Sequence, residues 1–359
     1  MDYVIFYTIV TLLLPLSLYF TQKRKIHFIS YHWSFSVFFS LTLIILIRAF
    51  AYDTGADYMV YYNNYLYNGN TVWGENREIG YKLLNSFLYN ISHLPQLFFG
   101  FATFIYMYAI LMVSQLFGKA DKWIVYFWFV ILFVLSYNLY RQYFSLSFIL
   151  LAYYWFVKNN FIKVFIYCAL AISFHTSAII GLTIIIGTYL LRNKDISIKY
   201  LLLAIILTTV ASSTILSTFL ESLSFVSNWY YQETGKLYSS SEFLESRYET
   251  SILLYPSMIS YLILVWYGNN LVKEFPKLRF TFYLFTLALI IEPLTNQEIL
   301  MRIRLYIAIF IPLILGSLAY RYKKIWRYPI LWGALFYLII KFTYTLYYLG
   351  SVYPLHFKL

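Results

Sequence analysis

The chain has few charged residues and a single cysteine. Only 12% of its 359 residues are Asp, Glu, Lys or Arg, against 61% hydrophobic residues, and this composition is too apolar for a soluble globular protein. Cys168 has no second cysteine with which to form a disulfide or a thiolate metal site within the chain. The five histidines show no paired metal-ligand spacing on one helix. A phosphate-binding glycine loop and a dinucleotide fingerprint are also missing, so we expect no metal and no cofactor.

Long apolar runs take the place of charge. A spanning helix needs about 20 apolar residues, and backbone groups in hydrocarbon must be paired within the segment. We therefore predict an all-α, polytopic membrane protein with about twelve transmembrane helices, folded as a single domain over residues 1–359. The predicted spans are residues 3–20, 32–50, 96–117, 123–139, 142–157, 163–174, 177–191, 200–219, 251–268, 280–297, 304–320 and 329–349.

The basic residues indicate the orientation of these spans. Most of the 27 Lys and Arg residues lie in the turns after alternate spans: Lys23, Arg24, Lys25; Lys119, Lys122; Lys158, Lys163; Arg192, Lys194, Lys199; Lys273, Lys277, Arg279; and Arg321, Lys323, Lys324, Arg327. The positive-inside rule places these turns in the cytoplasm and both termini outside. The first run precedes its basic cluster and lacks a cleavage site, which predicts a retained helix. The net charge of +12 is explained by turns that face anionic lipid, without a nucleic-acid partner.

Two external segments are long enough to have structure of their own, residues 51–95 and residues 220–250. In the first, Tyr58, Tyr61, Tyr62 and Tyr65 follow i, i+3, i+4, i+7 spacing, which predicts a short interfacial helix. Such tyrosines either anchor the protein at the level of the lipid headgroups or stack on sugar rings. The second segment is acidic and serine-rich, as expected of a lid or a long connection.

Ionisable residues gather at the external ends of the predicted spans. A charge at this depth is costly and normally faces a cavity, so these residues are candidates for a functional site. They are Arg48, Asp53, Asp57, Arg141, His175, Glu292, Glu298, Arg302 and Arg304. Permanently charged arginines grip phosphate oxygens in a bidentate manner and suit a lipid-linked diphosphate. The alternative is that they reach the lipid headgroups or pair with nearby carboxylates, which is less expected of Arg141, between two apolar stretches.

Several motifs resemble those of one family in order and spacing. RAFAYDTGADYMVYY (Arg48 to Tyr62), ENREIGYKLLN (Glu75 to Asn85), NLYRQYFSLS (Asn138 to Ser147), SFHTSAII (Ser173 to Ile180) and MRIRLYIAIF (Met301 to Phe310) resemble elements of EpsG-family and Wzy-type bacterial polysaccharide polymerases. The chain departs from the family pattern at Ala56 and in its long acidic second loop.

This resemblance implies a metal-independent glycosyltransferase, for which we expect a GT-C-like architecture. It implies work on undecaprenyl-diphosphate-linked repeat units, both donor and acceptor, at the outer, periplasmic face of the bacterial inner membrane. An acceptor hydroxyl attacks the anomeric carbon of the growing chain, and undecaprenyl diphosphate leaves. Attack from the face opposite the diphosphate would invert the anomeric configuration, as in single-displacement glycosidases. Membrane lipids, a chain-length regulator and a flippase are the other partners that it implies.

Roles for individual residues follow from this chemistry. We expect Arg141, Arg302 and Arg304 to neutralise the diphosphate, and Arg48 to hold the second carrier's diphosphate or to pair with Asp53. His175 is the leading candidate for the general base, with Asp57 and Glu292 as competitors. Alternatively, His175 is a structural residue that bonds to Ser173 or Thr176. We expect substrate contacts from Asp53, Tyr58, Glu78 and Gln142.

Two other functions stay open at this level. A ligase of the same fold, like an O-antigen ligase, would move a finished glycan to a different acceptor with one shared catalytic geometry. A flippase or transporter for the lipid-linked glycan would also carry charged residues inside the membrane. Against transport, the sequence shows no inverted internal repeat, and the candidate residues gather at one end of the helices.

Overall fold

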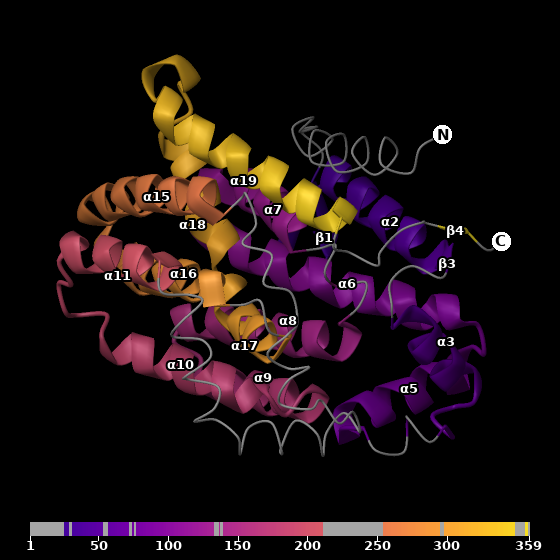
Figure 1. Cartoon of the computed structure of the whole chain (residues 1–359). Helices are drawn as coiled ribbons and strands as arrows, with labels where there is room; N and C mark the ends of the chain where they lie inside the picture. Colours follow the sequence, from indigo (N-terminus) through magenta and orange to yellow (C-terminus); the bar gives the residue numbers. More distant parts are fainter. Residues whose placement is uncertain are drawn as a thin grey trace. The chain divides into compact units, whose positions relative to one another are not determined.

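The protein folds as a bundle of helices with two very small sheets (Figure 1). The computed structural model describes residues 25–28, 31–52, 57–71, 74, 77–132, 136, 139–210, 254–294, 298–348 and 356–357. This part of the chain confirms the prediction of an all-helical fold. It divides into two compact units, one with Met1–Leu182, Leu315–Lys323 and Ile339–Leu359, the other with Thr183–Ile314 and Lys324–Leu338. The single-domain organisation stays a prediction.

The first unit contains most of the N-terminal half of the chain. Its helices are α2 (Phe35–Phe50), α3 (Tyr58–Leu66), α5 (Ile79–Ile91), α6 (Pro95–Ser114), the 3₁₀-helix η1 (Gln115–Ala120), α7 (Asp121–Ile131), α8 (Tyr140–Val157), α9 (Phe161–Phe174) and the start of α10 (Ala178–Leu190). Helix α6 packs against both α2 and α8, and α8 packs against α9 (Figure 1). Buried aromatic rings fill the space between α6 and α8. The centroid of the Phe144 ring lies 5.4 Å from that of Tyr106 and 6.2 Å from that of Phe98.

Two antiparallel pairs of strands also belong to the first unit. Strands β1 (Lys25–Phe28) and β2 (Tyr31–Ser34) form a hairpin in the register Ile26 opposite Trp33. Strand β3 (Ala51–Tyr52) directly follows α2, and it pairs with β4 (His356–Phe357) from the other end of the sequence. The β3–β4 pair therefore holds the beginning of the segment 51–95 against the C-terminal part of the chain.

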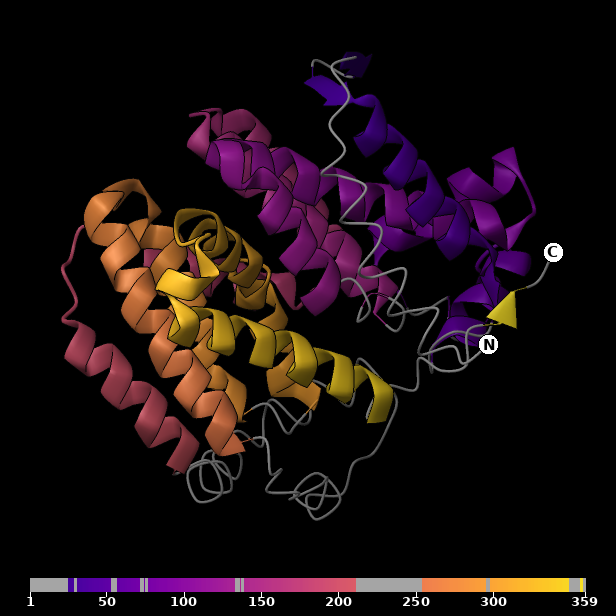
Figure 2. The ribbon, with the colours of Figure 1, turned by 90° about the horizontal axis from the view of Figure 1, so that it is seen from above.

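The second unit contains the end of α10, then α11 (Ile198–Val210), α15 (Leu254–Glu274), the 3₁₀-helix η3 (Pro276–Leu278), α16 (Arg279–Ile291), the 3₁₀-helix η4 (Glu292–Leu294) and α17 (Glu298–Ala308). Helix α18 (Ile311–Arg321) begins here and ends in the first unit, and α19 (Pro329–Tyr348), after the 3₁₀-helix η5 (Ile325–Arg327), does the same. Helices α11, α15 and α16 pack against one another, and both views show α11 and α15 side by side (Figure 2).

The predicted spans agree with helices over most of the described chain, and two spans need comment. The span 304–320 is divided by a turn at Ile309–Phe310 into α17 and α18. The span 123–139 agrees with α7 as far as Ile131, and residues 133–135, 137 and 138 of that span lie outside the described residues. By length and composition, two stretches of the described residues are able to cross a membrane, Pro95–Ile131 and Arg302–Arg321, and five apolar helices are shorter. The number twelve stays a prediction, and the span 3–20 lies outside the described residues.

A glycine brings two helix backbones into direct contact in the first unit. A Cβ atom at Gly316 of α18 would lie 2.5 Å from the backbone nitrogen of Ile124 in α7 and 2.7 Å from its Cα. Neither atom can move without moving α7 itself. Small residues at such contacts allow membrane helices to approach closely when lipid, rather than water, surrounds them.

We expect Gly316→Ala to destabilise the protein by about 1–3 kcal/mol, because overpacking at a backbone contact forces the helices apart. The matched control is Gly333→Ala in α19, where a Cβ would meet nothing within 4 Å and the better helix propensity of alanine applies. Thermal unfolding of the purified protein should show a lower midpoint for Gly316→Ala and an equal or higher one for Gly333→Ala. Equal midpoints for the two variants would show that the contact is not tight.

Candidate active site

The first turn of α8 carries the charged group around which the site is built. Helix α8 begins at Tyr140, directly after Leu139, which has a non-helical conformation. Arg141 is therefore held at the N-terminal end of a helix that is largely buried. Its side chain is 11% exposed and donates a hydrogen bond to the Glu78 carboxylate, whose own side chain is 9% exposed. This ion pair joins residues that are 63 positions apart in the sequence.

The position of Glu78 follows from the way α5 starts. Glu78 is the N-cap residue of α5 with an extended backbone, but its carboxylate makes no capping bond to its own helix. Two residues later, a Cβ at Gly80 would lie 2.5 Å from Ser173 Oγ and 2.8 Å from the Ser173 carbonyl oxygen. The missing side chain of Gly80 thus lets the start of α5 rest on the end of α9. This contact brings Glu78 to His175, the residue that follows α9.

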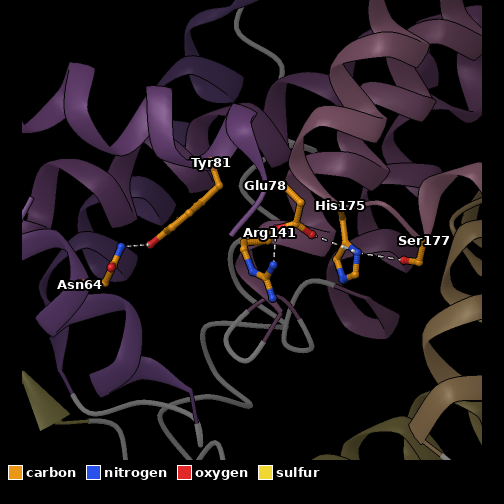
Figure 3. A network of polar contacts seen from close by, with 6 residues as sticks. All are labelled: Asn64, Glu78, Tyr81, Arg141, His175 and Ser177. Carbon is orange, nitrogen blue, oxygen red and sulfur yellow. Dashed lines mark hydrogen bonds and ion pairs between the residues drawn. The ribbon is translucent and has the colours of Figure 1, made fainter. Parts of the chain in front are cut away.

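His175 lies in the break between α9 and α10, as the sequence predicts. It is the C-cap residue of α9 with an extended backbone, and its side chain is 6% exposed. Ring nitrogen Nδ1 lies 3.0 Å from Ser177 Oγ and 3.7 Å from Glu78 Oε1. One carboxylate therefore faces both the Arg141 guanidinium and the His175 imidazole (Figure 3).

Tyr61 and Tyr81 are buried tyrosines of the first unit, and the charge of Arg141 acts on both phenols. Asn64 of α3 donates a hydrogen bond to the Tyr81 hydroxyl at 2.8 Å (Figure 3). Both tyrosines lie in the segment 51–95, outside the predicted spans. Burial raises the pKa of Tyr61, against the opposing effect of the Arg141 charge, and burial also raises the pKa of Tyr81. Both phenols therefore stay protonated near neutral pH and serve as hydrogen-bond groups rather than as bases.

The predicted exposure of the α3 tyrosines to lipid headgroups or sugar rings is wrong. The helix forms where it was predicted, but Tyr58, Tyr61 and Tyr65 are only 2%, 4% and 0% exposed. The Tyr58 ring stacks on Phe99 at 4.6 Å, and the Tyr61 ring lies 4.9 Å from Tyr140. The i, i+3, i+4, i+7 spacing identifies one face of the helix but not what covers it, and here the cover is the start of α6 and α8.

Arg48 is the second arginine attached to the first turn of α8. It belongs to the last turn of α2 and is completely buried. Its guanidinium donates a hydrogen bond to the Tyr140 hydroxyl and lies 3.5 Å from the Ser136 carbonyl oxygen. The predicted partner Asp53 lies outside the described residues. Tyr140 and Arg141 thus tie α2 and α5, respectively, to the same turn.

The second unit contains a separate ion pair. Arg304 of α17 donates to Glu292 Oε2 at 2.6 Å and, through Nε, to the Ala288 carbonyl oxygen at 3.1 Å. The side chains of Arg304 and Glu292 are 10% and 11% exposed. The sequence predicts that Arg304 binds a diphosphate and that Glu292 is a candidate general base. In the structure, the two residues form an ion pair with each other.

The remaining predicted residues have varied surroundings. Gln142 is 1% exposed inside α8. Arg302 is half-buried in α17. Asp57 precedes α3 as its half-buried N-cap residue, without a capping bond from its side chain. The segment 220–250 lies outside the described residues.

The arrangement in the first unit combines a cation, a carboxylate and an imidazole. The cation suits an anionic group, and the imidazole is able to take up a proton. Sequence reasoning found Arg141 and His175, but it missed the bond between Arg141 and Glu78 and the contact of His175 with Ser177. Signals for both were present, because Glu78 and Gly80 share one motif, and Ser177 lies in SFHTSAII. No group of three or more His, Cys, Asp or Glu side chains suitable for a metal occurs among the described residues.

A family model described as the EpsG family matches residues 33–357, which is nearly the whole chain. No curated protein and no solved structure matches it.

We expect the Glu78–Arg141 pair to couple strongly in a double-mutant cycle. Glu78→Gln or Arg141→Gln alone removes one half of a buried ion pair, which costs about 3–5 kcal/mol in buried pairs. The double variant removes both charges and should recover part of that loss, with a coupling on the order of 1–3 kcal/mol. Thermal unfolding of the four proteins measures it. Losses that simply add would mean that the pair contributes nothing as a pair.

Proposed function

Since the chain belongs to the EpsG family of Wzy-type polysaccharide polymerases, we propose that it polymerises undecaprenyl-diphosphate-linked oligosaccharide repeat units. Proteins of this family are membrane proteins. The proposal places about twelve spans in the bacterial inner membrane, as the apolar runs predict, with a GT-C-like architecture and an active site on the periplasmic side. The acceptor is a second lipid-linked unit, and undecaprenyl diphosphate is released.

One observation carries the proposal within the structure, namely the buried Glu78 carboxylate shared by Arg141 and His175. All three residues lie at helix ends: the starts of α5 and α8, and the break after α9. The distribution of basic residues predicts that these ends face outward. A lipid-linked diphosphate lies at this same depth, because its chain is in hydrocarbon and its sugars are in water.

The proposed reaction is a single displacement. The oxygen of an acceptor hydroxyl forms a bond to the anomeric carbon of the donor sugar. The bond from that carbon to the diphosphate oxygen breaks, and its electron pair leaves with undecaprenyl diphosphate. The hydroxyl proton passes to a base. Attack from the side opposite the diphosphate inverts the anomeric configuration, as in single-displacement glycosidases.

Arg141 is the group that stabilises the leaving diphosphate. Negative charge grows on the diphosphate as the bond breaks, and a fixed cation in a partly dehydrated site stabilises that charge more than water does. In the absence of substrate, Glu78 compensates Arg141. The diphosphate therefore exchanges with Glu78 as the partner of Arg141, and the structure has a second partner ready for the released carboxylate in His175, 3.7 Å away.

His175 is the proposed general base. With its proton on Nδ1, the ring donates toward Glu78 or Ser177, and the lone pair on Nε2 is directed to the acceptor hydroxyl. When Glu78 leaves Arg141, its full charge acts on the imidazole and stabilises the imidazolium that forms during attack. Positioned bases of this kind contribute about 10²- to 10⁴-fold. Metal is not required by these steps, because Arg141 supplies the positive charge.

The Arg304–Glu292 pair repeats the combination of a cation and a carboxylate in the second unit. We propose that Arg304 and Arg302, rather than the completely buried Arg48, bind the second carrier's diphosphate, through a similar exchange with Glu292. A chain-length regulator and a flippase are the proposed protein partners.

We expect purified protein in liposomes to convert undecaprenyl-diphosphate repeat units into a ladder of polymers, without loss in EDTA. Arg141→Ala and His175→Ala should each reduce the rate by about 10²-fold or more, because they remove charge stabilisation and proton transfer. The measurement is the rate of ladder formation on a gel. Matched controls are Arg192→Ala, which removes an arginine packed on Tyr189 in the second unit, and His93→Ala, which removes an exposed histidine.

The result also separates the alternatives. A ladder that survives in both site variants would reject this assignment of the site. Transfer to a different acceptor without any ladder would favour the ligase, and movement of fluorescent lipid-linked units across the membrane without any product would favour the flippase.

Glu78→Gln removes the charge that competes with the diphosphate for Arg141 and also the charge that supports His175. We therefore expect a lower KM for the lipid-linked donor, by a few-fold, together with a kcat reduced by about tenfold or more. Steady-state kinetics of the reconstituted protein measures both constants.

Glu78→Asp is the control, because it keeps the charge on a shorter side chain, and it should recover part of kcat. A Glu78→Gln variant with a raised KM would contradict the exchange and show that Glu78 binds the substrate directly.

A further inference from the structure

The first unit has a basic cavity that is lined by none of the residues of the proposed active site. It has a volume of about 590 Å³ and opens where the turn between α6 and α7 meets the end of α18. Three lysines and two aromatic side chains line it: Lys119, Lys122 and Lys323 with Trp123 and Tyr320. Cavities of this volume typically accept small molecules.

Two glycines position the backbone segments that carry these side chains. Gly118 has φ 59° and ψ −122°, a combination that is strained for other residues, and it turns the chain sharply between α6 and α7. One turn before Tyr320, Gly316 rests directly on the backbone of Ile124. These two glycines fix the ends of α7 and α18 beside each other, so the lysines on both sides face one cavity.

The charge of the cavity favours an anion. Its wall has three ammonium groups and one carboxylate, that of Asp121. The Asp121 carboxylate accepts a hydrogen bond from the backbone N–H of Lys122 at 2.7 Å, and the three ammonium groups outnumber this one carboxylate. Two or more lysines around one opening suit phosphate, which lysine binds as a point charge.

The position of the cavity favours a lipid as the source of that phosphate. The two described stretches that are long and apolar enough to cross a membrane are Pro95–Ile131 and Arg302–Arg321. The cavity lies at the end of the second and at the bend within the first. The turn between α6 and α7 and the turn after α18 both belong to the set that the positive-inside rule places in the cytoplasm. Trp and Tyr beside Lys are typical of the level of the lipid headgroups.

We propose that this cavity binds the phosphate headgroup of an anionic phospholipid in the cytoplasmic leaflet. The lysines pair with the phosphate, and Trp123 and Tyr320 pack against the glycerol and the first carbons of the acyl chains. This site is independent of the proposed polymerase reaction, because none of its residues belongs to that machinery.

Native mass spectrometry of the full-length protein tests the proposal. The protein is released from detergent in the presence of phosphatidylglycerol or phosphatidylcholine, and the fraction that retains one lipid is measured. We expect wild type to retain phosphatidylglycerol in preference to phosphatidylcholine. In the variant Lys119→Gln/Lys122→Gln/Lys323→Gln, that preference should fall by at least about tenfold, since each lysine near an anionic surface adds to the attraction.

The matched control is Lys194→Gln/Lys273→Gln/Lys277→Gln, which removes the same charge from exposed lysines of the second unit. It should bind phosphatidylglycerol like wild type. An equal loss in both variants would overturn the proposal, because total charge would then be sufficient.

A further arm adds inorganic phosphate at millimolar concentration. Displacement of the lipid by free phosphate, with no preference for the lipid, would identify a soluble phosphate compound as the ligand and would also overturn the proposal. The thermal unfolding midpoint of the cavity variant is the folding control. A midpoint equal to that of wild type excludes misfolding as the reason why the variant no longer retains the lipid.

Discussion

The buried carboxylate of Glu78 is the constraint around which the first unit is organised. A cation such as Arg141 is costly in a largely buried position unless an anion compensates it. The partner comes from a helix far away in the sequence, so α5 must lie across the ends of α8 and α9. The same need for compensation recurs between Arg304 and Glu292 in the second unit. Charge compensation thus determines which helix ends meet, and apolar packing fills the space between them.

Glycine makes these meetings possible. Helices surrounded by lipid gain little from hydrophobic association, so they depend on close contact and hydrogen bonds. Gly80 lets α5 touch the end of α9, and Gly316 lets α18 touch α7. In both places the contact lies beside a group of charged side chains. The positions of the charged side chains therefore depend on the lack of a side chain at these two glycines as much as on the charged residues themselves.

The sequence predicted the parts of the site better than their pairing. Apolar runs located most helices, since a helix in lipid needs a continuous apolar stretch, and the cost of buried charge identified Arg141 and His175. Periodicity has no information about which distant helix covers a given face, so the buried tyrosines of α3 were placed on the surface. The pairing of Glu78 with Arg141 likewise depends on tertiary contacts.

The adjacent anchors at the start of α8 limit how this protein tolerates insertions and deletions. Tyr140 holds Arg48 and Arg141 holds Glu78, while the rest of α8 packs on α6 and α9. One residue added inside α8 would rotate everything after it by about 100° relative to the anchors, and both sets of contacts could not be kept. One residue added before Leu139 leaves that relationship intact. Around α8, we therefore expect length variation in evolution in the connection that precedes the helix and not inside the helix.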